Sequence, residues 1–395
     1  MTAAQKRPVA AIGLMSGTSM DGVDAALILT DGHRIEGFGV ALTIDYDDAQ
    51  KAALCAAIEA ARSLPDSTAV PDVFAELGRD LARWHAAAVE RLMSEAGLES
   101  GDVAVVGFHG HTLRHAPERG FTWQAGDGDE LARLLGIPVV SDFRSADVAA
   151  GGEGAPLAPL YHAALLRSDT AGVARPIAWP VAVLNLGGVA NVTWVPGPED
   201  ADRLIAFDTG PGNALIDDWV LSQCGWSRDE NGALAASGQI HPELVAQALR
   251  HTYFVRPVPK SLDRDAFASL LQSPAWQGLS PADGAATLTA LTAASVARAV
   301  EHFPAPPKAW YVCGGGRHNP TLMAMLGQRL GAPVEPVEAL GWRGDSLEAE
   351  AFAYLAVRSR EGLPLSLPGT TGVSAPRGGG RLSVPAQRGR AQDAW

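Results

Sequence analysis

The sequence has few cysteines and an excess of acidic over basic side chains. Its three cysteines, Cys55, Cys224 and Cys313, are widely separated and odd in number, which fits neither a disulfide framework nor a paired zinc motif. We expect them to be reduced and buried as small apolar side chains. Lys and Arg total 31 against 44 Asp and Glu, and the net charge of −13 argues against nucleic acid or an anionic membrane as partner. A small metabolite fits this composition better.

Long apolar runs are also missing. The first apolar segment, Val9 to Met15, is interrupted by Gly13 and ends at Ser16, so it predicts a strand and not a signal peptide. No uninterrupted apolar stretch approaches the roughly 20 residues that span a bilayer. We therefore expect a protein of the reducing cytoplasm.

The chain is long enough for two hydrophobic cores, because 395 residues exceed what one core usually supports. Two groups of three short apolar segments each predict an antiparallel meander, and both are followed by alternating helical and strand patterns. The segments are Val9–Met15, Val23–Leu29 and Ile35–Leu42, then Val181–Leu186, Val189–Val195 and Leu204–Phe207. This repetition predicts a duplicated α/β architecture.

Helical and strand patterns fill the rest of each half. Helices are expected at Asp47–Arg62, Pro71–Ala96, Glu130–Leu135, Ala214–Gln223, Glu243–His251 and Pro281–His302, and strands at Val103–His109, Ile137–Val140 and Ala309–Val312. Gly151–Gly154 and the region of Pro176 and Pro180 are typical of joining loops. Ser374–Trp395 has no periodicity and is expected to be a mobile tail.

The turn from Ser16 to Asp24 lies between two predicted strands and combines small, hydroxyl and carboxylate residues. Its backbone N–H groups suit phosphate oxygens, Thr18 and Ser19 add hydroxyl donors, and Asp21 or Asp24 suits a hydrated Mg²⁺. A simple hairpin turn is the alternative at this point. A subtilisin-like serine is excluded, because the Asp and His of that triad precede the serine in the chain.

Two histidines end a predicted strand. His109 and His111 lie two residues apart and so share one face, which makes joint metal ligation geometrically possible, with His115 four residues on. No further ligand signature stands out among the other histidines. Besides a metal site, the two histidines could therefore form hydrogen bonds within the protein or contact a substrate.

A carboxylate and a glycine triplet follow strands of the second half. Asp208 stands at the exit of an apolar strand before a Gly-Pro-Gly turn and suits a general base, although an Asx-turn is the alternative. Gly314, Gly315 and Gly316 follow another strand and allow a flat ligand such as adenine or ribose to approach the backbone. Candidates for holding carboxylate or phosphate groups are Arg114, Arg144, Arg317 and Lys260.

In this order the motifs resemble the anhydro-N-acetylmuramic acid kinases, members of the sugar kinase, heat-shock ATPase and actin superfamily. The resemblance covers nearly the whole chain. It is carried by Gly13–Asp24, His109–Thr112, Asp142–Arg144 with Asp147, Gly151–Pro156, Asn185–Gly188 with Asn191, Phe207–Asn213, Cys313–Asn319, and Asp345 with Glu348–Ala353. Two positions depart from the family pattern, since His111 and Glu153 stand where Gln is usual.

The resemblance implies a fold and a reaction. The fold is α/β, with two ribonuclease H-like (actin-like ATPase) domains, each a mixed sheet flanked by helices, and an interdomain cleft for ATP and Mg²⁺. The first domain would span residues 1–140, completed by 355–395, and the second 141–354. The implied enzyme opens the 1,6-anhydro ring of 1,6-anhydro-N-acetylmuramic acid with water while the 6-oxygen receives the γ-phosphoryl group. N-acetylmuramic acid 6-phosphate and ADP result, as in cell wall (peptidoglycan) recycling.

The resemblance also implies residue roles. Asp208 would be the catalytic base that activates water, and Arg144 would pair with the lactyl carboxylate or position the sugar. The nucleotide would contact Gly17, Thr18, Ser19, Met20, Asp21, Gly22, Val23, Asp24, Gly187, Gly188, Gly314, Gly315 and Gly316. The sugar would contact His109, His111, Thr112, Arg144, Asn191 and Glu348.

Two other functions stay open from the sequence. A metal-dependent hydrolase would use His109 and His111 and would ignore ATP. A non-catalytic actin-like module would bind ATP as a conformational switch and would leave Asp208 and Arg144 without a task. A homodimer is compatible with the sequence, which does not determine the oligomeric state.

Overall fold

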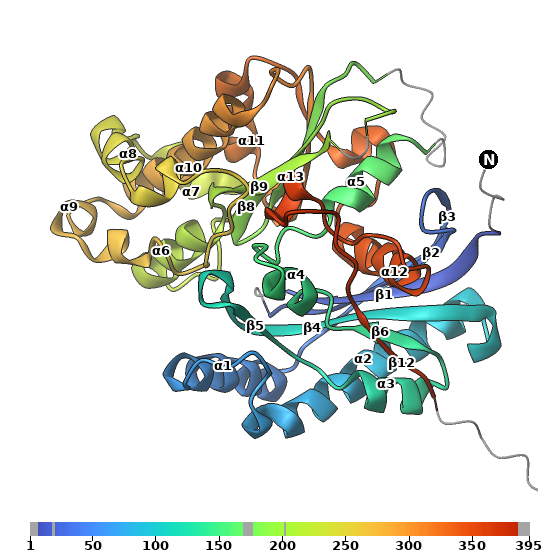
Figure 1. Cartoon of the computed structure of the whole chain (residues 1–395). Helices are drawn as coiled ribbons and strands as arrows, with labels where there is room; N and C mark the ends of the chain where they lie inside the picture. Colours follow the sequence, from blue (N-terminus) through green and yellow to red (C-terminus); the bar gives the residue numbers. More distant parts are fainter. Residues whose placement is uncertain (1–6, 18–19, 169–176, 201–202, 386–395) are drawn as a thin grey trace, which may run out of the picture. The chain divides into compact units, whose positions relative to one another are not determined.

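The computed structural model describes residues 7–17, 20–168, 177–200 and 203–385. The described chain divides into two compact units (Figure 1). Unit 1 comprises the described residues of Met1–Ala149, Glu348–Leu365 and Gly378–Trp395, and unit 2 those of Ala150–Leu347 and Ser366–Arg377. Both units are therefore built from separate stretches of the chain.

These boundaries differ in three places from those expected. Residues 141–149 belong to unit 1, where α4 (Ser145–Ala149) follows the last parallel strand. Nearly all of α12 (Leu347–Arg360) also belongs to unit 1, because it packs on the sheet of that unit. Residues 366–377 return to unit 2, where Ser366 and Arg377 form a backbone bridge.

Unit 1 contains one mixed sheet, whose described strands follow the order β12-β6-β4-β1-β2-β3, with β5 paired to β4. The strands are β1 Val9–Ser16, β2 Gly22–Thr30, β3 Ile35–Asp45, β4 Val103–Ala116, β5 Phe121–Ala125, β6 Val139–Ser141 and β12 Arg381–Ser383. β1, β2 and β3 form the predicted antiparallel meander, and β4 runs parallel to both β1 and β6. The first meander is thereby confirmed.

Helices cover both faces of this sheet. α1 (Asp48–Ser63), α2 (Ala75–Ala96) and α3 (Gly128–Leu135) share a hydrophobic core with Ile12 and Leu14 of β1. The side chains of a strand alternate between faces, so Gly13 points to the opposite face. There α12 lies directly on the strands, because a Cβ at Gly13 would come within 1.8 Å of the Ala349 carbonyl oxygen and one at Gly107 within 2.1 Å of that of Phe352. Glycine makes this close approach possible.

The described strands of unit 2 repeat the order β6-β4-β1-β2-β3 of unit 1. Their order is β11-β10-β7-β8-β9. They are β7 Val181–Leu186, β8 Val189–Val195, β9 Ile205–Pro211, β10 Trp310–Cys313 and β11 Val334–Pro336. β7, β8 and β9 form an antiparallel meander, and β10 runs parallel to β7 and β11. Both sheets thus have the ribonuclease H-like order predicted for a duplicated α/β fold.

The described helices of unit 2 are α5 Pro159–Leu166, α6 Ala214–Cys224, α7 Ala233–Ser237, α8 Pro242–Ala248, α9 Pro274–Gln277, α10 Pro281–Arg298, α11 Pro320–Leu330 and α13 Pro368–Thr371. Those from α6 to α11 contribute side chains to two apolar clusters. α10 is almost fully buried and joins the clusters, since it packs on β9 on one side and on α6, α7 and α8 on the other. A rigid support therefore lies behind the strand that carries Asp208.

Two expectations were wrong. Residues 374–385 of the expected mobile tail contain β12, which pairs antiparallel with β6, whereas residues 386–395 lie outside the described residues. The isolated sequence of β12 has too little periodicity to show this, because the strand is only three residues long. Cys55 is exposed and not buried, whereas Cys313 is buried.

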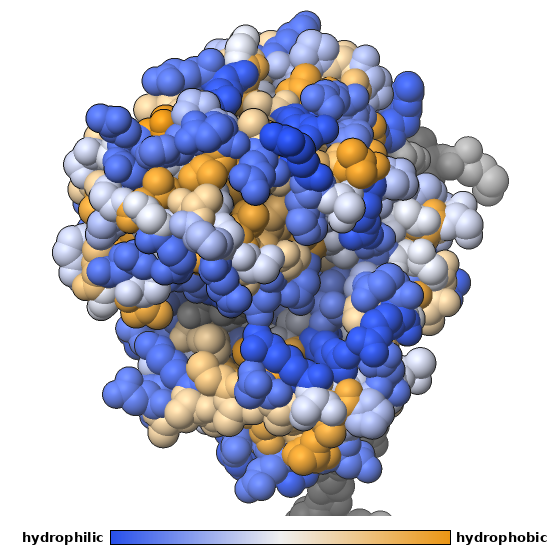
Figure 2. Space-filling view, turned by 90° about the vertical axis from the view of Figure 1, so that its left-hand side faces the viewer, coloured by the Kyte–Doolittle hydropathy of each residue, from blue (hydrophilic) through white to orange (hydrophobic). Residues whose placement is uncertain are grey.

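On the face drawn in Figure 2, hydrophilic side chains predominate and apolar residues lie scattered among them. None of the helices in the described ranges has the length and hydropathy of a membrane span.

Candidate active site

The predicted phosphate turn of unit 1 lies between the end of β1 at Ser16 and the start of β2 at Gly22. Thr18 and Ser19 lie outside the described residues. On either side of them, the Met20 N–H donates to the Gly17 carbonyl oxygen at 3.0 Å, and Met20 has a positive φ of 56°. A Cβ at Gly22 would lie 2.3 Å from the Ile44 carbonyl oxygen, so a larger residue would push β2 from β3. The described ends of the turn are therefore held by the backbone.

The carboxylates and the valine of this turn differ in their surroundings. Asp21 is exposed, and its carbonyl oxygen accepts the Tyr46 N–H at 3.0 Å. Asp24 accepts a hydrogen bond from the Thr43 hydroxyl at 2.6 Å. The Val23 side chain belongs to the apolar core, so it has only its backbone to offer a nucleotide.

A buried hydrogen-bonded chain anchors the end of β1. The Tyr46 hydroxyl donates to Ser16 Oγ at 2.8 Å, and Ser16 Oγ lies 2.8 Å from His111 Nδ1. Burial lowers the pKa of His111 to about 4, so its imidazole is neutral at pH 7 and accepts the Ser16 proton on Nδ1. Burial likewise raises the pKa of Tyr46 to about 12, which keeps the phenol a donor. His111 thus supports the turn through Ser16.

His109 holds Arg144. Its Nδ1 lies 2.9 Å from the Gly110 carbonyl oxygen, so it carries the ring proton, and its Nε2 accepts the Arg144 Nε–H at 3.0 Å. Burial and then the Arg144 charge keep the pKa of His109 well below its usual value, as this pairing requires. The ring also packs on Phe352 of α12, with 4.6 Å between centroids. Both nitrogens are engaged within the protein.

The metal-hydrolase alternative finds no support in this arrangement. His109 and His111 each use a nitrogen on a fixed protein partner. Over the described ranges, no group of three or more His, Cys, Asp or Glu side chains is placed to hold a metal ion.

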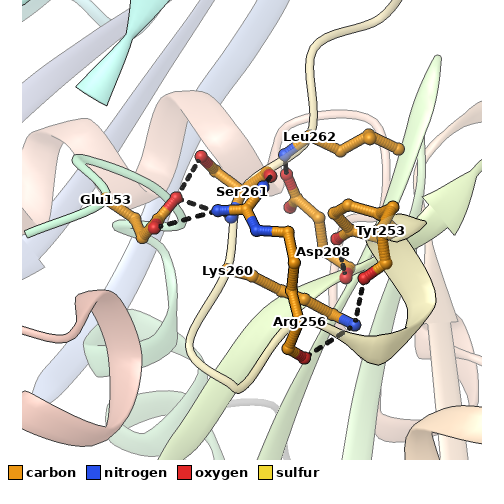
Figure 3. Close-up of polar contacts among 7 residues, drawn as sticks. All are labelled: Glu153, Asp208, Tyr253, Arg256, Lys260, Ser261 and Leu262. Atoms are coloured by element: carbon orange, nitrogen blue, oxygen red, sulfur yellow. Dashed lines mark hydrogen bonds and ion pairs between the residues drawn. The ribbon is translucent and has the colours of Figure 1, made fainter. Parts of the chain in front are cut away.

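In unit 2, Asp208 lies on β9 and is held by one distant segment. It is only 7% exposed, and its Oδ2 accepts the Leu262 N–H at 2.7 Å. Its own N–H donates to the Lys260 carbonyl oxygen at 2.9 Å, and its carbonyl oxygen accepts the Tyr253 hydroxyl (Figure 3). Burial, followed by the Asp208 charge, raises the pKa of Tyr253, so its phenol remains a proton donor. Main chain and carboxylate are fixed together.

Asp208 and two asparagines occupy neighbouring positions on three adjacent strands. Asn191 of β8 stands opposite Asp208 of β9 and opposite Asn185 of β7. Cross-strand partners project from the same face of a sheet, so these three side chains share one face. The predicted substrate residue Asn191 therefore lies beside the predicted base.

Two glycine segments meet at the carboxyl ends of the parallel strands β7 and β10. Asn213 binds the Gly187-Gly188 turn through its N–H to the Gly187 carbonyl oxygen at 2.8 Å. Gly314 has a φ of +75°, and a Cβ there would lie 2.3 Å from Asn185 Oδ1. A Cβ at Gly315 would meet nothing within 4 Å. The structure thus brings these predicted nucleotide segments together and leaves one glycine open.

Three of the basic side chains considered as ligands make contacts within the protein. Arg114 pairs with Asp66 at 3.2 Å, and buried Arg317 pairs with Glu338 and with Asp345, both at 2.9 Å. Lys260 is buried and donates to the carbonyl oxygens of Tyr253 and Arg256, at 3.1 and 3.5 Å. Arg144, which His109 holds, remains the predicted sugar ligand.

The chain matches the profile of the family described as "Anhydro-N-acetylmuramic acid kinase" over residues 9–383. It is 52% identical over 378 residues to the protein of that name from Paramagnetospirillum magneticum, covering 95% of this chain and 99% of the relative. With the Rhodospirillum rubrum protein of the same name it shares 55% identity over 370 residues, covering 94% and 93%.

The chain belongs to the anhydro-N-acetylmuramic acid kinase family. The family named from the motifs is therefore confirmed, with a chain that spans nearly the full length of these relatives.

Similarities to solved structures are more distant. The activator of 2-hydroxyisocaproyl-CoA dehydratase from Clostridium difficile with bound ADPNP is 12% identical, with a TM-score of 0.41 over 90% of this chain and 97% of that one. A ROK family glucokinase from Streptomyces griseus in complex with glucose and AMPPNP is 17% identical, with a TM-score of 0.38 over 88% and 99%. The fold assignment for this family member rests on the strand order of its own two sheets.

Several residues around the site were missed in the sequence. Ser16 was seen only as part of the turn, and Tyr46, Tyr253 and Ser261 were not singled out. Tyr253 lies 45 residues from Asp208, so no local spacing connects them.

Two predicted sugar contacts lie in unit 1. Thr112 lies on β4, where its hydroxyl accepts a hydrogen bond from Gln124 Nε2 at 3.3 Å, and Glu348 is exposed in the first turn of α12.

Proposed function

We propose that this chain is an ATP-dependent kinase that opens 1,6-anhydro-N-acetylmuramic acid with water and phosphorylates its 6-oxygen. Family membership supports the substrate, since the relatives carry the name anhydro-N-acetylmuramic acid kinase. The observation that carries the mechanism is the Asp208 carboxylate, which a backbone N–H holds at 2.7 Å on a strand backed by α10. A hydrogen bond to a carboxylate favours its ionised form, which a base needs.

In the proposed reaction Asp208 takes one proton from a water molecule. The water oxygen bonds to the anomeric carbon, and the bond from that carbon to the bridging 6-oxygen breaks. The electron pair of the 6-oxygen forms the new bond to the γ-phosphorus, while the bond from that phosphorus to the β–γ bridging oxygen breaks and ADP leaves. Fixed geometry contributes to such a displacement, because reacting groups must be aligned at short distance.

ATP is proposed to contact the glycine segments that the sequence predicts. The turn Gly17–Asp24 would contact the phosphates through backbone N–H groups, together with Gly187 and Gly188. Gly314, Gly315 and Gly316 would contact the base or ribose, since the position of a Cβ on Gly315 is open. Mg²⁺ is proposed to bind Asp21 or Asp24, since it prefers carboxylate, water and phosphate oxygens, and it would neutralise phosphate charge there.

The sugar is proposed to contact Arg144, with Thr112, Asn191 and Glu348 as further contacts. A guanidinium suits the lactyl carboxylate because it offers paired donors in a plane. His109 would act through Arg144 and His111 through Ser16, since these are the bonds their rings make. A cytoplasmic location and a homodimer remain predictions.

Labelled water tests the reaction. Protein, ATP, Mg²⁺ and 1,6-anhydro-N-acetylmuramic acid are incubated in ¹⁸O-water, quenched promptly and followed by mass spectrometry. We expect a phosphorylated sugar with one ¹⁸O on its anomeric carbon and none in its phosphate. Absence of phosphorylated sugar, or a label in the phosphate, contradicts the proposal.

A further inference from the structure

The Glu153 carboxylate binds one irregular segment of unit 2. Its Oε2 accepts the Ser261 N–H at 2.9 Å and the Ser261 hydroxyl at 2.6 Å, and its Oε1 lies 3.3 Å from Arg256 Nη2 (Figure 3). The carboxylate comes from the glycine-rich stretch Gly151–Gly154, which precedes α5. One charged side chain therefore holds two points of a segment that lies more than 100 residues away in the sequence.

Ser261 lies between two neighbouring residues, Lys260 and Leu262, that both bind Asp208. On one side the Lys260 carbonyl oxygen accepts the Asp208 N–H, and on the other the Leu262 N–H donates to Asp208 Oδ2. A shift of Ser261 therefore displaces an acceptor and a donor of Asp208 at once. Because residues 256–262 belong to no helix or strand, no regular backbone ladder holds them in place.

Tyr253, which precedes this segment, and Lys260 within it make further contacts around Asp208. Tyr253, in the short 3₁₀ helix η6 (Thr252–Val255), donates its hydroxyl to the Asp208 carbonyl oxygen. The Lys260 ammonium lies over the Tyr253 ring, 4.5 Å from its centroid, and donates to the Tyr253 carbonyl oxygen. These contacts fix the main chain of Asp208, whereas the Leu262 N–H next to Ser261 orients its carboxylate.

We infer that Glu153 is a positioning residue for the proposed base: through Ser261 it keeps the Leu262 N–H against Asp208 Oδ2. The inference rests on the proposed function of Asp208. Loss of the Glu153 acceptor releases Ser261, so the carboxylate loses both its orientation and a donor that favours its ionised form. The proton acceptor then works from a less defined position.

Graded variants separate positioning from folding. Glu153→Ala removes all three contacts, Glu153→Gln keeps an oxygen that accepts both Ser261 bonds, and Ser261→Ala removes only the hydroxyl bond. Glu230→Ala is the matched control, since Glu230 makes an exposed ion pair with Arg228 at 2.7 Å in the same unit. The measurements are kcat and the KM values for ATP and for the sugar, so that a loss in kcat at unchanged KM and its recovery in Glu153→Gln can be seen.

For Glu153→Ala we expect kcat to fall by about 10- to 100-fold, the loss that misplacement of a reacting group produces. KM for ATP should stay unchanged, because the glycine segments proposed for ATP are untouched. Glu153→Gln should recover most of kcat, Ser261→Ala should lie between them, and Glu230→Ala should equal wild type. Wild-type kcat in Glu153→Ala would overturn the inference. If Glu153→Ala does not fold, a wild-type kcat in Ser261→Ala overturns it.

Amide hydrogen exchange tests the same contact without turnover. Peptides that contain Leu262 should exchange faster in Glu153→Ala than in wild type and Glu230→Ala, because the segment loses its anchor. Equal exchange in all three contradicts the inference. If wild type makes no phosphorylated sugar, the proposed function fails, while the exchange result still decides whether Glu153 positions Leu262 against Asp208.

Discussion

Asp208 combines a position on a buried strand with a backbone donor from a distant segment. Its carboxylate is oriented by the Leu262 N–H, which does not depend on any side chain of that residue. An amide at position 208 keeps an oxygen for this bond but has no basic site for the water proton. The fold of unit 2 and the role of the carboxylate can therefore be tested separately.

Asp208→Asn should lower kcat by about 100-fold or more, because the general base is lost. Binding of ATP, measured by calorimetry, should change little, because the glycine segments are untouched. Asp218→Asn is the matched control, since Asp218 forms a part-exposed ion pair with Arg264 at 2.8 Å. Turnover close to wild type in Asp208→Asn would assign the base to another residue.

Lys260 is a buried ammonium that contacts two carbonyl oxygens and an aromatic ring. Burial, and then the charges of Arg256 and Arg298, lower the pKa of Lys260 from 10.5 to about 8. Between pH 8 and 10.5 the folded protein has released this proton while the unfolded chain still binds it. The contribution of Lys260 to the free energy of unfolding therefore rises with pH across this window.

Lys260→Met removes this titration. We expect the urea midpoint of wild type minus that of Lys260→Met to increase from about pH 7.5 to about pH 10. Arg264→Met, at a side chain that is 39% exposed, controls for general effects of pH on a cationic site. A difference that stays constant over this range contradicts a lowered pKa for Lys260.

At the scale of elements, the contact of α12 with the sheet of unit 1 depends on glycine. Along the helix, Ala349, Phe352 and Ala353 lie against the positions of Gly13 and Gly107. Phe352 also packs on His109, which binds Arg144. The packing of α12 and the placement of the proposed sugar ligand are therefore linked within unit 1.

Gly13→Ala should destabilise the protein by about 3 kcal/mol, because the backbone of α12 cannot yield as a flexible side chain would. The measurement is the shift of the urea midpoint. Gly101→Ala is the matched control, since a Cβ at Gly101 meets nothing within 4 Å. Equal midpoints for the two variants would show that α12 does not lie on β1 as described.

At the scale of the whole molecule, unit 1 is assembled from stretches far apart in the chain. Arg358 of α12 donates to the Gly32 carbonyl oxygen at 2.7 Å, across 326 residues of sequence. At the sheet edge, β12 pairs with β6, and Ser383 and Arg381 both bind Asp129. An N-terminal fragment therefore lacks a face and an edge of its sheet.

Residues 1–149 alone should show no cooperative thermal transition, because the apolar face under α12 is exposed. The same fragment joined by a long Gly-Ser linker to residues 348–385 should recover one, followed by far-UV circular dichroism. A second fusion protein, with the same linker and the sequence of residues 348–385 scrambled, controls for the added length. A cooperative transition in the bare fragment contradicts the assembly described.

Much of the fold could be predicted from the sequence because its signals are local. Both meanders showed as short apolar segments separated by turns, and α1 began at the capping box of Asp47 and Gln50. The ends of α2 and α3 were marked by Gly97 and Gly136, each with positive φ. The family followed from the order of the segments from Gly13–Asp24 to Glu348–Ala353.

Parts of the site were decided only by the tertiary structure. The bonds of Asp208 to Tyr253 and of Glu153 to Ser261 join residues 45 and 108 positions apart, so no spacing in the sequence announces them. The engagement of His109 by Arg144 likewise changed a possible metal ligand into a support. Periodicity and turn chemistry act between neighbours along the chain, and they determined elements and motifs. Burial and pairing act between neighbours in space, and they determined what each side chain is able to do.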